Sequence, residues 1–178
     1  ANHASHLDAL ALAAALRGIA ARRAHAMAAG DLFFANPAVS AFAAYAINAL
    51  PVWRGRSRRA DLDAMRQRLA EDGLVYILFP EGTRSRDGAM APFQPGLGML
   101  VAGTDIPVVP CWLEGAGEAW PAQSATPRPF RPLSLTIGPP LHFAGAGRDR
   151  AGWQSVAAEA EAAVRRLAPP PQASGQGS

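Results

Sequence analysis

Residues 74–86, LVYILFPEGTRSR, hold the strongest fold signal in this chain of 178 residues. The first six residues form an unbroken apolar run, which is typical of a parallel strand that is buried on both faces. A polar loop containing Gly82 follows at once, and ligands of open α/β sheets bind at the carboxyl ends of the strands. The stretch therefore predicts a central strand at 74–79 and, directly after it, the place of a functional site.

Helical and extended patterns alternate on both sides of this strand. Helices are predicted over 6–19, 38–49, 59–71, 97–102 and 150–167, and further strands over 23–28, 50–53, 107–113 and 133–137. Helices between parallel strands define an α/β layered domain. We therefore expect one α/β domain over 1–168, with a mostly parallel central sheet flanked by helices. Residues 169–178, rich in Pro, Gly, Ser and Gln, are expected to form a disordered tail.

The composition excludes several classes of protein. Apolar residues make up 49% and charged residues 17%, which excludes a disordered acidic chain and a coiled coil. Cys111 is the only cysteine in the sequence, and a single buried thiol suits a reducing compartment. The formal charge of +3 is too small an excess to indicate nucleic acid as a partner. It is compatible with a phosphorylated substrate or an anionic membrane surface.

One uncharged stretch, residues 32–53, is long enough to cross a bilayer. Pro37 and Pro51 interrupt it, so about a dozen helix-compatible residues remain between them. We therefore expect a core or interfacial helix there rather than a spanning one. The stretch ends beside a run of arginines that begins at Arg54.

A histidine and an aspartate stand where a turn enters the first predicted helix. His3 can reach Asp8 only from the turn before the helix, because residues five apart in a helix point about 140° away from each other. An N-cap at Ser5 would give that geometry. An aspartate that accepts from one imidazole nitrogen leaves the other free to take a proton, so His3 is a candidate general base. Ser5-x-x-Asp8 also fits a capping box, which would explain Asp8 without catalysis.

Two further groups of polar residues could bind an anion. After the central strand, Arg84 offers a planar fork for a phosphate, and Glu81 could orient it or bind a hydroxyl. Arg54 begins an arginine cluster at a helix start, where cations oppose the helix dipole and a phosphate or lipid headgroup could hold them. A polar turn and a solvated charge run are the respective alternatives. The four histidines lack metal-ligand spacing, so no metal site is expected.

A fourth block, IPVVPC at 106–111, has two prolines within a predicted strand. Proline cannot donate to a strand ladder, so the block indicates an interrupted or bent strand that forms the floor of an apolar pocket. Cys111 is expected to be buried and inert, because no neighbour in the sequence would activate its thiol.

Four blocks in order, NHASHLD (2–8), LPVWR (50–54), FPEGTRS (79–85) and IPVVPC (106–111), resemble the motifs of the glycerolipid acyltransferase family. That family includes the enzymes that acylate 1-acyl-glycerol-3-phosphate to phosphatidate. The resemblance covers roughly residues 2–143, and FPEGTRS after a His-x4-Asp is highly specific. The second block departs from the pattern at Pro51 and Trp53, which leaves the acceptor open. The family usually has a strand before the first motif, so we expect an N-terminally truncated domain.

The resemblance implies roles for single residues. His3 would be the base and Asp8 its orienting partner. Pro110 would shape the acyl pocket. The acceptor-phosphate and glycerol site would be formed by residues of the second and third blocks, namely Arg54, Glu81, Gly82, Thr83 and Arg84.

The implied function is O-acyl transfer in phospholipid biosynthesis. The acyl group would come from acyl-CoA or acyl carrier protein, with no cofactor, and the acceptor would be a lysophospholipid, above all 1-acyl-glycerol-3-phosphate. The protein would work at the cytoplasmic face of a membrane, bound peripherally or through a preceding segment. Alternatives are another acceptor (a lyso-aminolipid or glycerol-3-phosphate), a lipid-binding module without catalysis, and a hydrolase using Ser5 or Cys111, although no Gly-x-Ser-x-Gly elbow is present.

Overall fold

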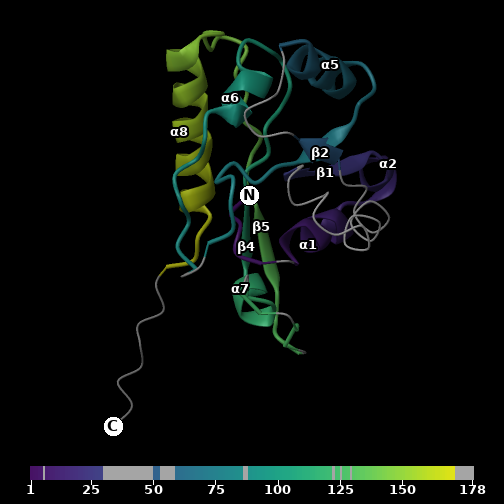
Figure 1. Ribbon diagram of the computed structural model, residues 1–178, viewed down its shortest axis with the longest axis vertical. Helices are drawn as coiled ribbons and strands as arrows, with labels where there is room; N and C mark the ends of the chain where they lie inside the picture. The colour runs from purple at the N-terminus through teal and green to yellow at the C-terminus, as the bar shows by residue number, and fades with distance from the viewer. Residues whose placement is uncertain are drawn as a thin grey trace.

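The computed structural model describes residues 1–5, 7–29, 50–52, 59–85, 88–121, 123–124, 126–128 and 130–170. The helix predicted at 38–49, Arg54 and most of the predicted tail lie outside the described residues. Figure 1 shows α8 (Arg150–Arg166) beside α6 (Gly96–Val101) at one side of the molecule and α1 (Asp8–Ala15) at the opposite side, with strands between them.

A three-stranded parallel sheet carries one side of the domain. It consists of β1 (Ala24–Ala29), β2 (Leu50–Val52) and β3 (Val75–Ile77) in the order β2-β1-β3. The register places His25 opposite Tyr76. The strands predicted at 23–28, 50–53 and 74–79 are therefore confirmed, the last in a shorter form.

The expectation that the strand at 74–79 is central is wrong for the described strands, because β1 lies between the other two. β3 is nevertheless packed on both faces. Tyr76 and Leu78 pack against the cluster around α6 and α8. Val75 and Ile77 belong to the cluster that contains Leu12 of α1. Burial between two layers of helices, rather than a central place in the sheet, accounts for the apolar run.

A second sheet pairs β4 (Cys111–Glu114) with β5 (Ser134–Ile137) in antiparallel orientation. The strand predicted from residue 107 starts only at Cys111, because Pro107 and Pro110 cannot donate to a ladder. Val108 makes an isolated bridge with Leu141 instead. A short helix that the sequence analysis missed, α7 (Ala116–Ala119), follows β4. The parallel arrangement that was expected thus holds for the first sheet alone.

Two helices replace the one predicted over 6–19, namely α1 (Asp8–Ala15) and α2 (Gly18–Arg22). The chain turns between them, where Leu16 is extended and Gly18 has a φ of 61°, a value that glycine adopts without strain. The helices predicted at 59–71, 97–102 and 150–167 are confirmed close to their expected bounds, as α5 (Arg59–Ala70), α6 (Gly96–Val101) and α8 (Arg150–Arg166). Within the described residues no helix is long and apolar enough to cross a membrane.

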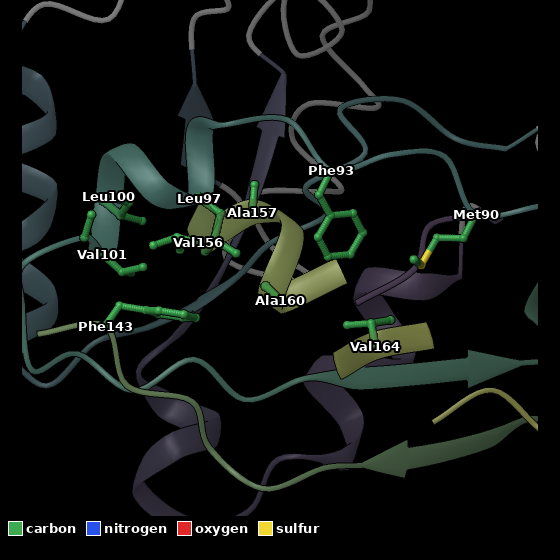
Figure 2. Packing of buried hydrophobic residues seen from close by; sticks show 11 residues of the cluster. Met90, Phe93, Leu97, Leu100, Val101, Phe143, Val156, Ala157, Ala160 and Val164 are labelled. Atoms are coloured by element: carbon green, nitrogen blue, oxygen red, sulfur yellow. The ribbon is translucent and has the colours of Figure 1, made fainter. Parts of the chain in front are cut away.

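The main core lies where α6 packs on α8 (Figure 2). Its buried residues come from the two helices, the loop before α6, the residue after α6 and the segment between β5 and α8: Met90, Phe93, Leu97, Leu100, Val101, Ala102, Phe143, Val156, Ala157, Ala160 and Val164. The loop at 89–95 leads into α6. Its large apolar side chains Met90 and Phe93 are buried here, and Phe93 also lines an apolar pocket.

Gly98 is a point of close approach between α6 and α8. A Cβ on Gly98 would overlap the backbone oxygen and Cα of Trp153. Gly98→Ala is therefore expected to lower the free energy of unfolding by about 1–3 kcal/mol, the usual cost of overpacking, as measured by urea denaturation. Gly96→Ala is the matched control, because a Cβ there meets nothing within 4 Å. Equal losses in both variants would show that helix packing is not the cause.

Candidate active site

His3, in the turn before α1, contacts Asp8, the first residue of that helix. The distance from His3 Nδ1 to Asp8 Oδ2 is 2.8 Å. Asp8 is only 1% exposed, whereas the His3 side chain keeps 21% of its surface exposed. A carboxylate that accepts from Nδ1 leaves Nε2 as the nitrogen that can exchange a proton with another molecule. The structure thus brings together the two residues that the sequence analysis paired.

The same carboxylate oxygen holds the backbone of the turn. Asp8 Oδ2 also accepts from the N–H groups of Ala4, at 2.7 Å, and Ser5, at 2.8 Å. The bond from Ser5 has the form of the capping-box bond in which an acidic side chain reaches back to a backbone N–H, but Asp8 is the first residue of α1 and not the third, so the expected capping box is not formed. Asp8 nevertheless has both a structural and a candidate catalytic role, since one oxygen binds the backbone of the turn and the imidazole together.

Ser5 is not the helix N-cap that was expected. Leu7 takes that position and has no side-chain cap, so α1 begins later than predicted. The Ser5 hydroxyl is 1% exposed, donates to the carbonyl of Trp120 at 2.7 Å and accepts from the N–H of Leu7 at 3.1 Å. The bond to Trp120 connects the turn with the segment after α7, 115 residues further along the chain.

Glu81 of the third block holds the backbone of the first block. It is 4% exposed, and its Oε1 accepts from the N–H of His3 at 2.6 Å while Oε2 accepts from Ala91 at 2.8 Å. The N–H of Ser85 donates to the carbonyl of His3 at 2.8 Å. Burial raises the pKa of Glu81, although the two N–H groups act in the opposite direction. Both oxygens of this carboxylate are thus engaged with backbone.

The ring of Phe79 stacks on the His3 imidazole. The ring centroids are 4.1 Å apart and the planes differ by 18°. Phe79 lies two residues after β3, so the stacking places the His3 ring near the carboxyl end of that strand. The sequence shows Phe79 as the first residue of the FPEGTRS block. It does not show that the Phe79 ring contacts His3.

Helix α8 holds the loop that carries Ala91. Glu161 Oε2 accepts from the N–H of Phe93 at 2.8 Å, and Arg165 donates to the carbonyl of Met90 at 3.0 Å. The N–H of Phe93 lowers the pKa of Glu161, with a smaller effect from Arg165. The sequence does not show this support, because Glu161 lies 68 residues after Phe93.

The structure describes four of the five remaining expected site residues, and they differ in exposure. Gly82 and Thr83 are exposed and Arg84 is half-buried in the loop after β3. Pro110 is buried and lines an apolar pocket of about 540 Å³ beside β3 and α6. Arg54 lies outside the described residues.

Cys111, the first residue of β4, is half-buried rather than fully buried as expected. Burial nevertheless raises the pKa of its thiol, so the thiolate is disfavoured. In the part of the chain that the structure describes, no three His, Cys, Asp or Glu side chains lie close enough to hold a metal ion.

The fold and the site together define an α/β domain with a histidine–aspartate pair at the ends of its strands. A family model described as Acyltransferase matches residues 1–114, which is more than half of the chain. The chain therefore belongs to the acyltransferase family, and the resemblance found in the four sequence blocks is confirmed.

Relatives and a solved structure agree with this assignment. The chain is 39% identical over 74 residues to the 1-acyl-sn-glycerol-3-phosphate acyltransferase of Limnanthes douglasii, covering 42% of this chain and 26% of that protein. It is 35% identical over 75 residues to the enzyme of that name from Pseudomonas aeruginosa, covering 42% and 28%. The chain thus spans about a quarter of the length of these curated relatives.

The solved structure is similar over most of the chain. The 1-acyl-sn-glycerophosphate (LPA) acyltransferase PlsC from Thermotoga maritima has a TM-score of 0.62 and 23% identity, and the match covers 93% of this chain and 62% of that one. This likeness confirms the α/β fold.

Proposed function

We propose that this domain transfers a fatty acyl group from acyl-CoA or acyl carrier protein to the hydroxyl of 1-acyl-glycerol-3-phosphate, which gives phosphatidate. The observation that carries the proposal is the His3–Asp8 pair, a buried carboxylate bonded to Nδ1 of a partly exposed imidazole. Relatives named 1-acyl-sn-glycerol-3-phosphate acyltransferase support the choice of acceptor. The reaction requires no cofactor beyond the acyl donor.

In the proposed reaction, Nε2 of His3 accepts the proton of the acceptor hydroxyl while the oxygen attacks the thioester carbonyl carbon. The new C–O bond forms, the C–S bond breaks, and the proton passes from His3 to the departing thiolate. Asp8 keeps Nδ1 protonated and stabilises the imidazolium that forms in between. General-base catalysis of this kind contributes about 10²–10⁴-fold to a rate.

Two features favour direct transfer over an acyl-enzyme. The Ser5 hydroxyl is buried and already bonded to Trp120 and Leu7. The thiol of Cys111 has a raised pKa, which leaves little thiolate to act as a nucleophile. A thioester is activated by itself, so the acceptor hydroxyl can attack it once His3 takes the proton. The hydrolase alternative finds no support in these contacts.

We assign the acceptor phosphate to Arg84 together with Arg54, and the glycerol to the neighbouring Gly82 and Thr83. Glu81, which the sequence resemblance placed in the same site, is buried and holds the backbone of His3 and Ala91 instead. The apolar pocket lined by Pro110 has the walls that an acyl chain requires. Since the acceptor is a lipid, we place the reaction at the cytoplasmic face of a membrane.

The proposal is tested by product analysis. The protein is incubated with 1-acyl-glycerol-3-phosphate, a lyso-aminolipid or glycerol-3-phosphate, each with acyl-CoA and with acyl carrier protein, and the products are identified by mass spectrometry. Phosphatidate is the expected product. Acylation of the lyso-aminolipid alone would overturn the proposed acceptor, and binding without any product would favour the non-catalytic module.

Arg84→Lys is expected to raise the KM for the phosphorylated acceptor about tenfold, which corresponds to about 1.4 kcal/mol. Lysine keeps the charge but loses the planar fork that matches a phosphate. Initial rates against acceptor concentration measure the change. Arg166→Lys, at the exposed end of α8, is the matched control. An equal loss with an acceptor that lacks a phosphate would contradict the phosphate role.

A further inference from the structure

Asn2 is buried directly before His3, and its side chain bonds to a strand more than a hundred residues away. It is 8% exposed. Its Nδ2 donates to the carbonyl of Leu113 at 2.9 Å, and its Oδ1 accepts from the N–H of Leu113 at 2.8 Å. One side-chain amide thus satisfies both backbone groups of one residue in the middle of β4.

This pairing uses the edge of β4 that points away from β5. Backbone groups along a strand point alternately to its two edges. The carbonyl of Pro110 accepts from the N–H of Gly138 and therefore points toward β5. Leu113 is an odd number of residues further along the strand, so its N–H and carbonyl point to the opposite edge. The Asn2 amide therefore occupies the position in which the backbone of a neighbouring strand would bond to β4.

Residues 1–2 also contact the other sheet. The nitrogen of Ala1 donates to the carbonyl of Leu78, just after β3, at 3.2 Å. The two residues before His3 thus connect the parallel sheet with the antiparallel pair. Since His3 itself is bonded to Glu81 and Ser85 through its backbone, its position depends on how this connection is made.

We propose that Asn2 is a positioning residue for His3. The hydrogen bonds of its side-chain amide fix the position of the first block relative to β4, the strand into which the 106–111 block leads. This position determines where Nε2 of His3 lies at the ends of the strands. One residue at the edge of a strand presents a carbonyl and an N–H side by side, so its partner must offer a donor and an acceptor side by side. At this side-chain length only a carboxamide does so. For its effect on the reaction rate, this inference rests on the proposed acyl transfer.

Asn2→Asp is the decisive variant because it keeps the shape and loses the donor. The new oxygen would face the carbonyl of Leu113, so the register of the turn should change. We expect kcat to fall roughly 10–10²-fold, as for a misplaced catalytic group, with the KM of donor and acceptor almost unchanged. The ¹⁵N shifts of the His3 imidazole, which report its tautomer and its bond to Asp8, should change as well.

Val156→Ala is the control for a merely structural role. Val156 is 1% exposed in the core between α6 and α8, so its truncation lowers stability away from the site. It should leave kcat and the His3 shifts unchanged at temperatures where the protein stays folded. Asn2→Ala removes both bonds without introducing a charge, so it should also lower kcat and change the His3 shifts, and it replaces Asn2→Asp if that variant does not fold.

The outcomes separate this inference from the proposed function. Wild-type kcat and His3 shifts in Asn2→Asp, or a change no larger than in Val156→Ala, would overturn the positioning role. If the wild-type protein shows no acyl transfer, the proposed function fails, whereas a change of the His3 shifts in Asn2→Asp alone would still support the positioning role.

Discussion

Replacing His3 with alanine is expected to lower kcat for acyl transfer by about 10²–10⁴-fold, the usual contribution of a general base. The fold should survive, because the contacts of His3 with Glu81 and Ser85 run through its backbone and do not need the ring. Release of free thiol from the acyl donor, at saturating donor and acceptor, measures the rate. Thermal unfolding of the same sample verifies that the protein is folded.

His142→Ala is the matched control for this experiment. His142 is exposed between β5 and α8, so its loss should change neither the rate nor the unfolding temperature. Should folded His3→Ala retain a near-wild-type rate, the imidazole would not be the base. The capping of the turn would then be the whole explanation for Asp8.

Asp8→Asn is expected to lower kcat by about 10²-fold or more, because an amide cannot stabilise the imidazolium that forms during the reaction. Its single oxygen can still accept from Ala4 and Ser5, but these bonds lose the strength that a charged acceptor gives. A loss of stability should therefore accompany the loss of rate. Steady-state kinetics and urea denaturation of one preparation measure the two effects separately.

Asp149→Asn is the matched control for the change of Asp8. Asp149 is exposed and caps α8 by accepting from the N–H of Gly152 at 2.8 Å. Asparagine is about as good an N-cap as aspartate, so this variant should keep both kcat and stability. A loss of stability in Asp8→Asn with an unchanged kcat would reduce Asp8 to a structural role.

The local parts of this protein were open to prediction from the sequence. The apolar run at 74–79, the amphipathic helix at 150–167 and the strand at 133–137 depend on periodicities within a few residues, and all three were confirmed. The contact of His3 with Asp8 was also predictable, because a turn before a helix can bring together residues five apart. The four blocks were enough to indicate the family, which the family model confirms.

The tertiary structure alone decided how these parts serve the site. The central position of β1, the use of both Glu81 oxygens by backbone N–H groups and the bond of Ser5 to Trp120 all differ from or add to what the sequence predicted. The pairing of Asn2 with Leu113 belongs to the same class. Each of these depends on which buried backbone groups still need a partner after the strands have paired. Such partners come from segments that are far apart along the chain. The spacing of neighbouring residues in the sequence therefore cannot predict them.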